Sequence, residues 1–298
     1  MKFNKLLKFV SSFALSLVLM LGFVTPTFAA STDTNSTTTL NLMAAASTRY
    51  SLGERGVDGA YPSGTLLRAF EDQNANIKVN VTYDSSGNLL NQMIADPNHS
   101  ADIFISADLA RMNSAVTANI IQADTVYNLL NNKLVLIANP NTGLTENSLQ
   151  YSDVLGWLND NPGTTIAVGD PAVVPAGTYT KQVFDAIDST TWNDILTHAT
   201  LYSNVTNVLT AVANNVNQLG SVYATDAKTD SNLIVLATED VNIIYPIGIT
   251  NAAMSDTVSR APASQALVNF LKADIAKSTD LPINGGSVFK YFGFSPAQ

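Results

Sequence analysis

Apolar and polar positions along the chain follow two periods in turn, and this pattern predicts a fold of strands and helices. Short apolar or alternating runs are typical of strands, and between them apolar residues recur three or four positions apart, as on one helical face. This order favours an α/β protein with mixed, mostly parallel sheets flanked by helices. Strands are predicted at 40–45, 77–83, 102–106, 133–138, 164–168, 219–223, 233–237 and 243–249.

Helical spacing predicts a first helix at 63–73, with Ser63 as its cap. The charged, Gly-rich stretch 48–62 before it is predicted to be an inserted loop, where Arg49 and Arg55 either add positive charge near a ligand or are simply solvated. An aromatic tail at 288–294 is expected to pack against other elements. Further helices are predicted around 89–94, 109–116, 175–187, 192–196, 205–216 and 266–271.

Two polar interruptions suggest that the chain forms two lobes. The turn Asn139-Pro140-Asn141 ends one strand and is interpreted as a crossing into a second lobe, and the polar link 238–240 as the return. The first lobe is therefore predicted to comprise 40–136 and 239–298, and the second lobe 137–238. About 260 residues are enough for two lobes with a core each.

The start of the chain has the pattern of an export signal. Three lysines within the first eight residues precede an apolar run at 9–24 and a small-residue end at 27–30. This predicts a secretory signal peptide at 1–29, followed by a disordered leader at 30–39. Because the chain contains no cysteine, a lipid anchor on cysteine and disulfides are excluded. The mature protein is expected to be soluble and either periplasmic or extracellular.

The charge balance limits the possible partners. The chain has 15 basic and 24 acidic residues, and removing the three signal-peptide lysines leaves 12 basic ones, a net charge of about −12. Such a chain is expected to avoid nucleic acid and anionic membrane surfaces. Any anion that it binds must therefore be held by local hydrogen bonds.

The most informative stretch is 168–180, where a predicted strand leads through a tight loop into a helix. Pro175 is suited to the first helical position, and Ala176 and Gly177 leave backbone N–H groups free beside it. Free N–H groups at a helix start attract anions. Taken alone, the stretch is equally typical of an ordinary strand-to-helix turn.

Four residues share one kind of position in the predicted fold. Ser47, Ser86, Ala176 and Val205 each lie at the carboxyl end of a strand or at the start of the following helix, where ligands bind such sheets. Two belong to each predicted lobe, which favours a ligand cleft between the lobes. Tyr223 ends another strand, and by its position alone it would cover the edge of the core.

Two enzymatic alternatives are weaker. An exported serine hydrolase would need Ser47 or Ser86 with a histidine and an aspartate, Asp84 or Asp170, but there are only two histidines and no Gly-x-Ser-x-Gly motif. Two separate histidines and no cysteine also make a poor set of metal ligands. The chain is therefore not expected to be an enzyme, and neither a side-chain metal site nor a cofactor is predicted.

An ordered set of motifs resembles the periplasmic molybdate-binding proteins of ABC transporters, the ModA-like group of type II solute-binding proteins. The motifs keep the family order and span nearly all of the mature chain. They are Ala44-Ala-Ala-Ser47, Asp84-Ser-Ser-Gly87, Ala101-Asp-Ile-Phe-Ile-Ser-Ala-Asp108, Val168-Gly-Asp-Pro171, Val174-Pro-Ala-Gly177, Leu219-Gly-Ser-Val-Tyr223 and Phe289-Lys-Tyr-Phe-Gly-Phe294.

The resemblance implies a type II periplasmic-binding-protein fold and a specific donor set. Ser47 and Ser86 would each give a hydroxyl and an amide, Ala176 and Val205 an amide each, and Tyr223 its hydroxyl. It further implies a monomer that captures molybdate and tungstate as oxyanions and delivers them to an ABC permease. Another oxyanion, such as sulfate, is the alternative ligand. Asp84 either caps the second helix or repels an anion.

Overall fold

The computed structural model describes residues 36–280 and 285–297, which belong to one compact unit. The predicted signal peptide and residues 30–35 of the predicted leader lie outside the described residues. The end of the leader was assigned wrongly, because the first strand already begins at Thr38. Thr38 and Thr39 pair with Ile77 and Lys78 of the neighbouring strand, so their polar side chains do not prevent strand formation.

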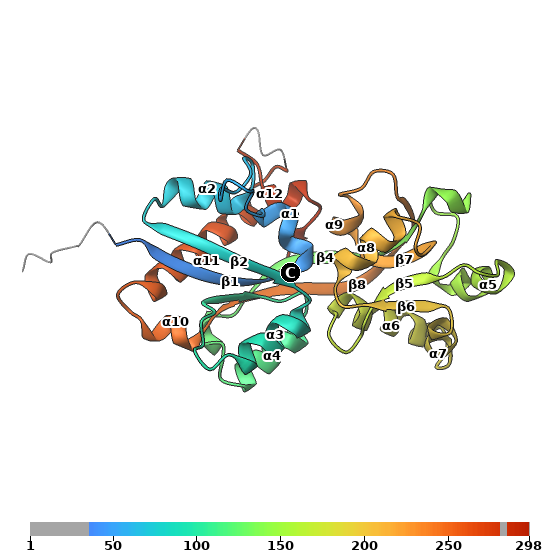
Figure 1. Cartoon of the computed structure of the whole chain (residues 1–298), viewed down its shortest axis with the longest axis horizontal. Helices are drawn as coiled ribbons and strands as arrows, with labels where there is room; N and C mark the ends of the chain where they lie inside the picture. The colour runs from blue at the N-terminus through green and yellow to red at the C-terminus, as the bar shows by residue number, and fades with distance from the viewer. Residues whose placement is uncertain (1–35, 281–284, 298) are drawn as a thin grey trace, which may run out of the picture. The chain divides into compact units, whose positions relative to one another are not determined.

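The described strands form one mixed sheet with helices on both faces (Figure 1). Four pairings between strands are parallel and four are antiparallel, so parallel pairs do not dominate as the sequence suggested. Across the sheet the order is β2 (Ile77–Asp84), β1 (Thr38–Ala45), β3 (Ile103–Ile105), β8 (Ile234–Ile249), β4 (Tyr127–Ala138), β7 (Leu219–Tyr223), β5 (Ile166–Gly169) and β6 (Ala199–Tyr202), with β9 (Ser295–Pro296) against β4.

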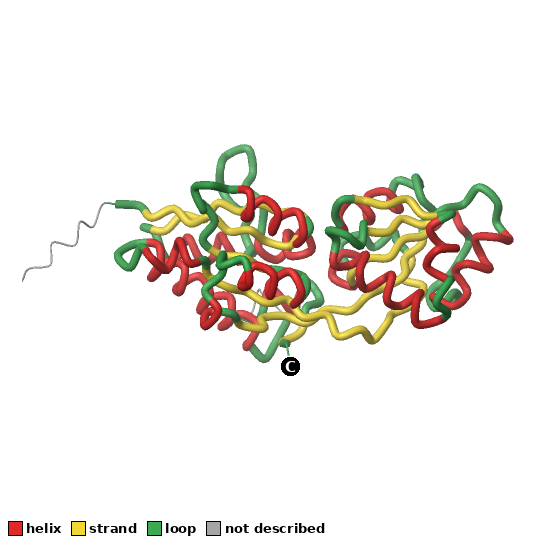
Figure 2. Tube along the Cα trace, turned by 90° about the horizontal axis from the view of Figure 1, so that it is seen from below, coloured by secondary structure: helices red, strands yellow, loops and turns green. Residues whose placement is uncertain are grey.

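The long strands β4 and β8 connect two groups of shorter strands. One end of β8 pairs with β3, and its other end pairs with the part of β4 that also pairs with β7. Figure 2 shows these strands running from one group to the other. The two predicted lobe boundaries, after residues 136 and 238, lie close together in the β4–β8 ladder, where Val135 pairs with Thr238 and Leu136 with Ala237. The lobe boundaries themselves stay a prediction.

The prediction of two strands at 233–237 and 243–249 was wrong, because β8 is continuous from Ile234 to Ile249. The polar residues between them, 238–240, were interpreted as a link. Glu239 pairs with Leu134 instead, and β4 supplies a pairing partner along most of the strand. A polar run therefore remains extended when a neighbouring strand satisfies its backbone groups.

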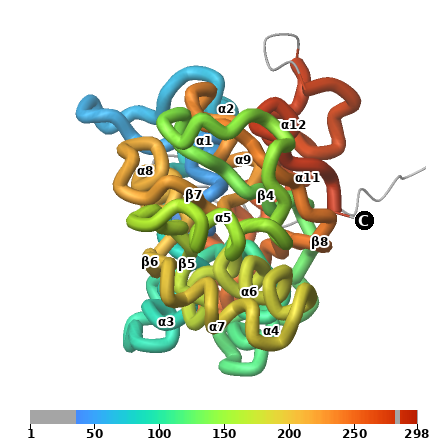
Figure 3. Tube along the Cα trace, turned by 90° about the vertical axis from the view of Figure 1, so that its right-hand side faces the viewer, coloured from blue at the N-terminus to red at the C-terminus, as the bar shows by residue number. Residues whose placement is uncertain are grey.

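The helices mostly occupy the predicted positions. Figure 3 shows α5 to α8 gathered around β5, β6 and β7. In chain order the α-helices of the described residues are α1 (Arg49–Leu52), α2 (Leu66–Gln73), α3 (Ser86–Ala95), α4 (Leu109–Thr117), α5 (Val154–Asp160), α6 (Pro175–Ile187), α7 (Thr191–Leu196), α8 (Val205–Ala213), α9 (Ala224–Ala227), α10 (Asn251–Ser255), α11 (Arg260–Ala276) and α12 (Val288–Tyr291).

Three predicted boundaries were wrong for local backbone reasons. Ser63 does not cap α2, because Gly64 has a φ of +83° and the helix begins at Leu66. The predicted helix to Val216 ends at Ala213, because Asn215 shortly after it has a φ of +56°. The predicted loop 48–62 begins with helical residues, since a 3₁₀ turn at Ala46–Thr48 leads directly into α1.

Candidate functional site

A small cavity of about 10 Å³ lies where β1, β2 and β7 end and where α3, α6 and α8 begin. Helix amino ends leave backbone N–H groups free, and ligands of α/β sheets bind beside the carboxyl ends of strands. The cavity is about the size of one water molecule. Its lining residues are Ala45, Ala46, Ser47, Asp84, Ser85, Ser86, Ala107, Val174, Pro175, Val205 and Tyr223.

The structure brings the sequence-predicted site residues together. Ser47, Ser86, Val205 and Tyr223 all line the cavity, and Ala176 follows the lining residue Pro175 in the first turn of α6. All five are buried, with at most 4% of their surface exposed. These segments are far apart in sequence, so their convergence comes from the sheet order. The binding role of the five residues stays a prediction.

Ser86 is placed as a donor rather than as a helix cap. The Ser85 Oγ atom accepts a hydrogen bond from the Asn88 N–H, which makes Ser85 the cap of α3. The Ser86 Oγ atom instead accepts from the Ala107 N–H at 2.8 Å. Because that bond uses only a lone pair, the Ser86 hydroxyl hydrogen remains available to an acceptor in the cavity.

Two polar side chains, which were not identified from the sequence, orient Ser47 through a series of hydrogen bonds. The Asn132 Nδ2 atom donates to the Tyr245 Oη atom at 3.2 Å, and that hydroxyl lies 2.8 Å from the Ser47 Oγ atom. With Asn132 donating to it, Tyr245 can give its own hydrogen to Ser47, which leaves the Ser47 hydrogen free. Tyr245 lies in β8 within a predicted strand, whereas Asn132 lies in β4 just before the strand predicted at 133–138.

The Tyr223 hydroxyl has no hydrogen-bond partner within the part of the chain that the structure describes, although it is buried and its residue lines the cavity. A buried polar group without a partner is costly, so an acceptor in the cavity would relieve a penalty already present. Burial raises the pKa of Tyr223 well above its usual value, with smaller contributions from Tyr245, Tyr179 and Asp108. The phenol is therefore neutral and can donate.

Backbone amides complete the donor set. Ala176 and Val205 lie in the first turns of α6 and α8, where an N–H group has no partner within its own helix. The side chain of Asn204 accepts from the Asn207 N–H and so caps α8. In α6, Gly177 allows the helix to approach β5, because a Cβ atom there would lie 1.9 Å from the Gly169 carbonyl oxygen.

Asp84 precedes the cap residue Ser85 and does not itself cap α3, so the predicted capping role was wrong. Its Oδ1 atom accepts from the Ser85 N–H at 2.7 Å and from the Asn88 Nδ2 atom at 3.2 Å. Two donors on the same oxygen stabilise the carboxylate beside the cavity. Asp84 is thus a fixed negative charge at the rim, so any bound anion must be held by short hydrogen bonds.

A second carboxyl group close to the site is also buried. Asp226 follows Tyr223 by three residues, and neither of its carboxyl oxygens has a hydrogen-bond partner in the described parts of the chain. Burial raises the pKa of Asp226 to about 7, against a smaller lowering by the N–H groups of Tyr223 and Asp226. A substantial fraction of Asp226 is therefore protonated at neutral pH.

Several charged or ionisable candidates lie elsewhere. Arg49 pairs with Glu54 at 2.6 Å, and Arg55 pairs with Glu71 at 2.5 Å, so neither lines the cavity. His99 lines a separate pocket of about 190 Å³, and His198 is also absent from the cavity lining, so the structure forms no Ser–His pair at Ser47 or Ser86. Among the described residues no group of three carboxylate or histidine side chains could hold a metal ion.

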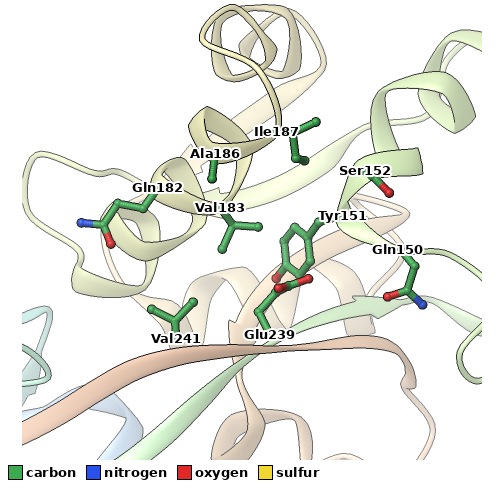
Figure 4. A pocket seen from close by; sticks show the side chains of 9 residues that line it. All are labelled: Gln150, Tyr151, Ser152, Gln182, Val183, Ala186, Ile187, Glu239 and Val241. Carbon is green, nitrogen blue, oxygen red and sulfur yellow. The ribbon is translucent and has the colours of Figure 1, made fainter.

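A larger pocket of about 420 Å³ lies beside α6 and β8, away from the converging helix starts (Figure 4). Figure 4 shows the Glu239 carboxylate near Tyr151, and the walls include Val183, Ile187 and Val241. An acidic group and aliphatic walls do not favour an anion. The small cavity, with its hydroxyl and amide donors, is therefore the stronger candidate.

The chain is similar to known binding proteins over most of its length. The chain is 28% identical to the molybdate-binding protein ModA of Escherichia coli, over 86% of this chain and 97% of the relative. Among solved structures it is similar to the periplasmic molybdate-binding protein of Azotobacter vinelandii, with a TM-score of 0.62, 18% identity and coverage of 87% of this chain and 100% of the other. The sulfate-binding protein SubI of Mycobacterium tuberculosis gives a TM-score of 0.60, 14% identity and 88% coverage of both chains.

The resemblance inferred from the motifs is thus confirmed, as is the α/β fold of type II periplasmic binding proteins. A family model described as bacterial extracellular solute-binding protein matches residues 60–279, which is most of the chain. The chain therefore belongs to the bacterial extracellular solute-binding proteins.

Proposed function

We propose that this protein binds molybdate and tungstate in the small cavity and delivers them to an ABC permease. The observation that carries the proposal is the buried hydroxyl of the lining residue Tyr223, which has no hydrogen-bond partner in the described chain. The free hydroxyl hydrogens of Ser47 and Ser86 and the amides of Ala176 and Val205 support it.

A shell of neutral donors suits a doubly negative oxyanion. Burying such an ion without hydrogen bonds is prohibitive, but each bond to a charged acceptor contributes roughly 1.5 to 3 kcal/mol. About seven such bonds can offset the lost hydration and leave a micromolar or tighter complex, about −8 kcal/mol or better. When the hydroxyls and amides all donate toward the cavity, an acceptor-only tetrahedral ion fits them, whereas a protonated phosphate directs its O–H at a donor.

Sulfate is the second candidate, because the SubI structure has a similar fold and sulfate is also an acceptor-only dianion. Hydrogen bonding alone does not distinguish sulfate from molybdate, so the size of the ion must determine which one binds more tightly. A tetrahedral oxyanion is larger than the water-sized space of about 10 Å³, so binding requires the surrounding segments to move apart. The longer Mo–O and W–O bonds bring the oxygens of molybdate and tungstate nearer to donors arranged around such a widened cavity.

The transport role rests on the family and on the relatives. The E. coli relative is named for molybdate binding, and a Bacillus subtilis relative at 28% identity, a putative ABC transporter substrate-binding lipoprotein, is aligned over 89% of both chains. No helix in residues 36–280 or 285–297 has the length and apolar character needed to cross a membrane. We infer an exported monomer that exchanges its ligand with a separate permease.

Isothermal titration calorimetry with molybdate, tungstate, sulfate and phosphate at pH 7.5 tests the ligand assignment. Molybdate and tungstate are expected to bind with micromolar or lower Kd, and sulfate and phosphate at least about a hundredfold more weakly, a difference of about 3 kcal/mol. Tight sulfate binding with no heat from molybdate would assign the protein to sulfate. No heat from any of the four ions would remove the oxyanion proposal.

A further inference from the structure

One arginine outside the cavity joins two segments that meet at the candidate site. Arg111 lies on α4, the helix that follows β3. Its guanidinium contacts the segment 171–178, which comprises the loop after β5 and the first turn of α6. Its Nη2 atom donates to the carbonyl oxygens of Pro171 at 3.0 Å and Ala172 at 3.3 Å. Its Nη1 atom donates to the Thr178 Oγ1 atom at 3.2 Å.

The guanidinium is held in place from its own side by a carboxylate. Asp108 caps α4 and accepts from Arg111 Nη1 at 2.6 Å, and the exposed fractions of the two side chains are only 6% and 14%. Charge-assisted bonds between partly buried groups are stronger than those of exposed pairs. Because the planar guanidinium donates to four acceptors at once, it favours one position of the 171–178 segment relative to α4.

A second contact shows how closely the same segment approaches α3. The Gly87 N–H donates to the Val173 carbonyl oxygen at 2.9 Å, and a Cβ atom at Gly87 would lie 2.6 Å from the Val173 Cα atom. The two backbones therefore touch directly. The next residues of that segment are Val174 and Pro175, which line the cavity, and Ala176.

Arg111 also neutralises a charge near the candidate site. Asp108 is close enough to Tyr223 to contribute to the raised pKa of its phenol, after burial and the two other tyrosines. Without Arg111, the Asp108 carboxylate would lie unpaired beside a site that must hold a dianion. Removing the guanidinium therefore both frees the 171–178 segment and adds repulsion.

We propose that Arg111 is a positioning residue for anion binding: it clamps the 171–178 segment over the cavity and so slows the release of the ion. The inference rests on the proposed function for its ligand, but the clamp itself concerns the protein alone. Arg111 does not line the cavity, so its effect is expected on the lifetime of the closed site rather than on the donor set.

The absence of cysteine from the chain allows a specific distance measurement. Exposed Asn113 on α4 and exposed Ser189 beyond α6 are changed to cysteine and labelled with a dye pair, and energy transfer is recorded without ligand and after mixing with molybdate. Arg111→Met is expected to lengthen the distance without ligand and to raise the molybdate release rate about tenfold, with an association rate no lower than that of the parent protein.

Three further variants make the test selective. Arg68→Met is the matched control, since Arg68 forms an exposed pair with Asp72 on α2, and it is expected to change neither quantity. Arg111→Lys keeps the charge but loses the planar fork, so its release rate should lie between those of the parent and Arg111→Met. Thr178→Val, which removes one of the acceptors, should shift the release rate in the same direction by a smaller factor.

Two outcomes would overturn the clamp. Identical distances and release rates for Arg111→Met, Arg68→Met and the parent would show that the contact positions nothing. A fall in the association rate with an unchanged release rate would assign Arg111 to steering instead. If the parent binds no molybdate, the proposed function fails, whereas the distance comparison without ligand still decides whether Arg111 holds the segment.

Discussion

Tyr223→Phe and Ser86→Ala are each expected to weaken molybdate binding by about 1 to 3 kcal/mol, or about 5- to 150-fold in Kd. Each change removes one hydroxyl that donates to the ion and leaves a charged acceptor without a partner. In Tyr223→Phe the protein alone loses an unpartnered buried hydroxyl, so its unfolding temperature should be unchanged or higher. Calorimetric titration with molybdate and a thermal melt measure the two effects.

The controls remove the same groups from the surface. Tyr127→Phe and Ser114→Ala change exposed residues outside the cavity, and they should leave the molybdate Kd within about twofold of the parent. In Tyr223→Phe, weaker molybdate binding without a loss of stability would show that the hydroxyl contacts the ligand and does not merely support the fold. Unchanged affinity in both Tyr223→Phe and Ser86→Ala would mean that the ion binds elsewhere.

Asp226→Asn is expected to stabilise the protein above neutral pH. The pKa of Asp226 rises from its ordinary 3.8 to about 7 on folding, so the folded state binds more protons than the unfolded state between these values. This group's contribution to stability is therefore largest below about pH 4, falls as the pH rises to about 7, and is constant beyond it. The full shift corresponds to about 4 kcal/mol, at about 1.4 kcal/mol per pKa unit.

Asparagine removes the charge but keeps a polar group without partners, which costs about 1 to 3 kcal/mol. The net gain in unfolding free energy at pH 8 should therefore be about 1 to 3 kcal/mol, with a smaller gain or a loss at pH 4.5. Denaturant unfolding at both pH values measures it, with exposed Asp240→Asn as the control. A gain that grows as the pH falls would show that Asp226 is ionised in the folded protein.

The alternating periods were enough to predict the order of most strands and helices, because buried runs such as 40–45 and 219–223 have one dominant pattern. They failed where a neighbouring strand decides the outcome. The polar residues 238–240 are extended only because β4 pairs with β8, and that pairing joins residues about a hundred positions apart. Local periodicity does not contain this information.

In the candidate site, too, some residues follow from local sequence and others depend on tertiary contacts. Helix-start positions such as Ser86 and Val205 follow from local sequence, and the structure brings them to one cavity. Tyr245 and Arg111 could not be found in this way, because their partners depend on which elements meet in space. Each has an ordinary local setting, one in an apolar strand and one on a helix, and only the tertiary contacts show that one orients Ser47 and the other spans two segments.

The central claim is that neutral donors from separate segments surround a doubly negative oxyanion. A crystal structure of the protein with molybdate, using the anomalous scattering of molybdenum to locate the metal, tests it most directly. We expect a single strong anomalous peak in the cavity, with the molybdate oxygens within about 3 Å of the Ser47, Ser86 and Tyr223 hydroxyls and of the Ala176 and Val205 amides. A peak at any other place, or an ion held by arginine or lysine side chains, would contradict it.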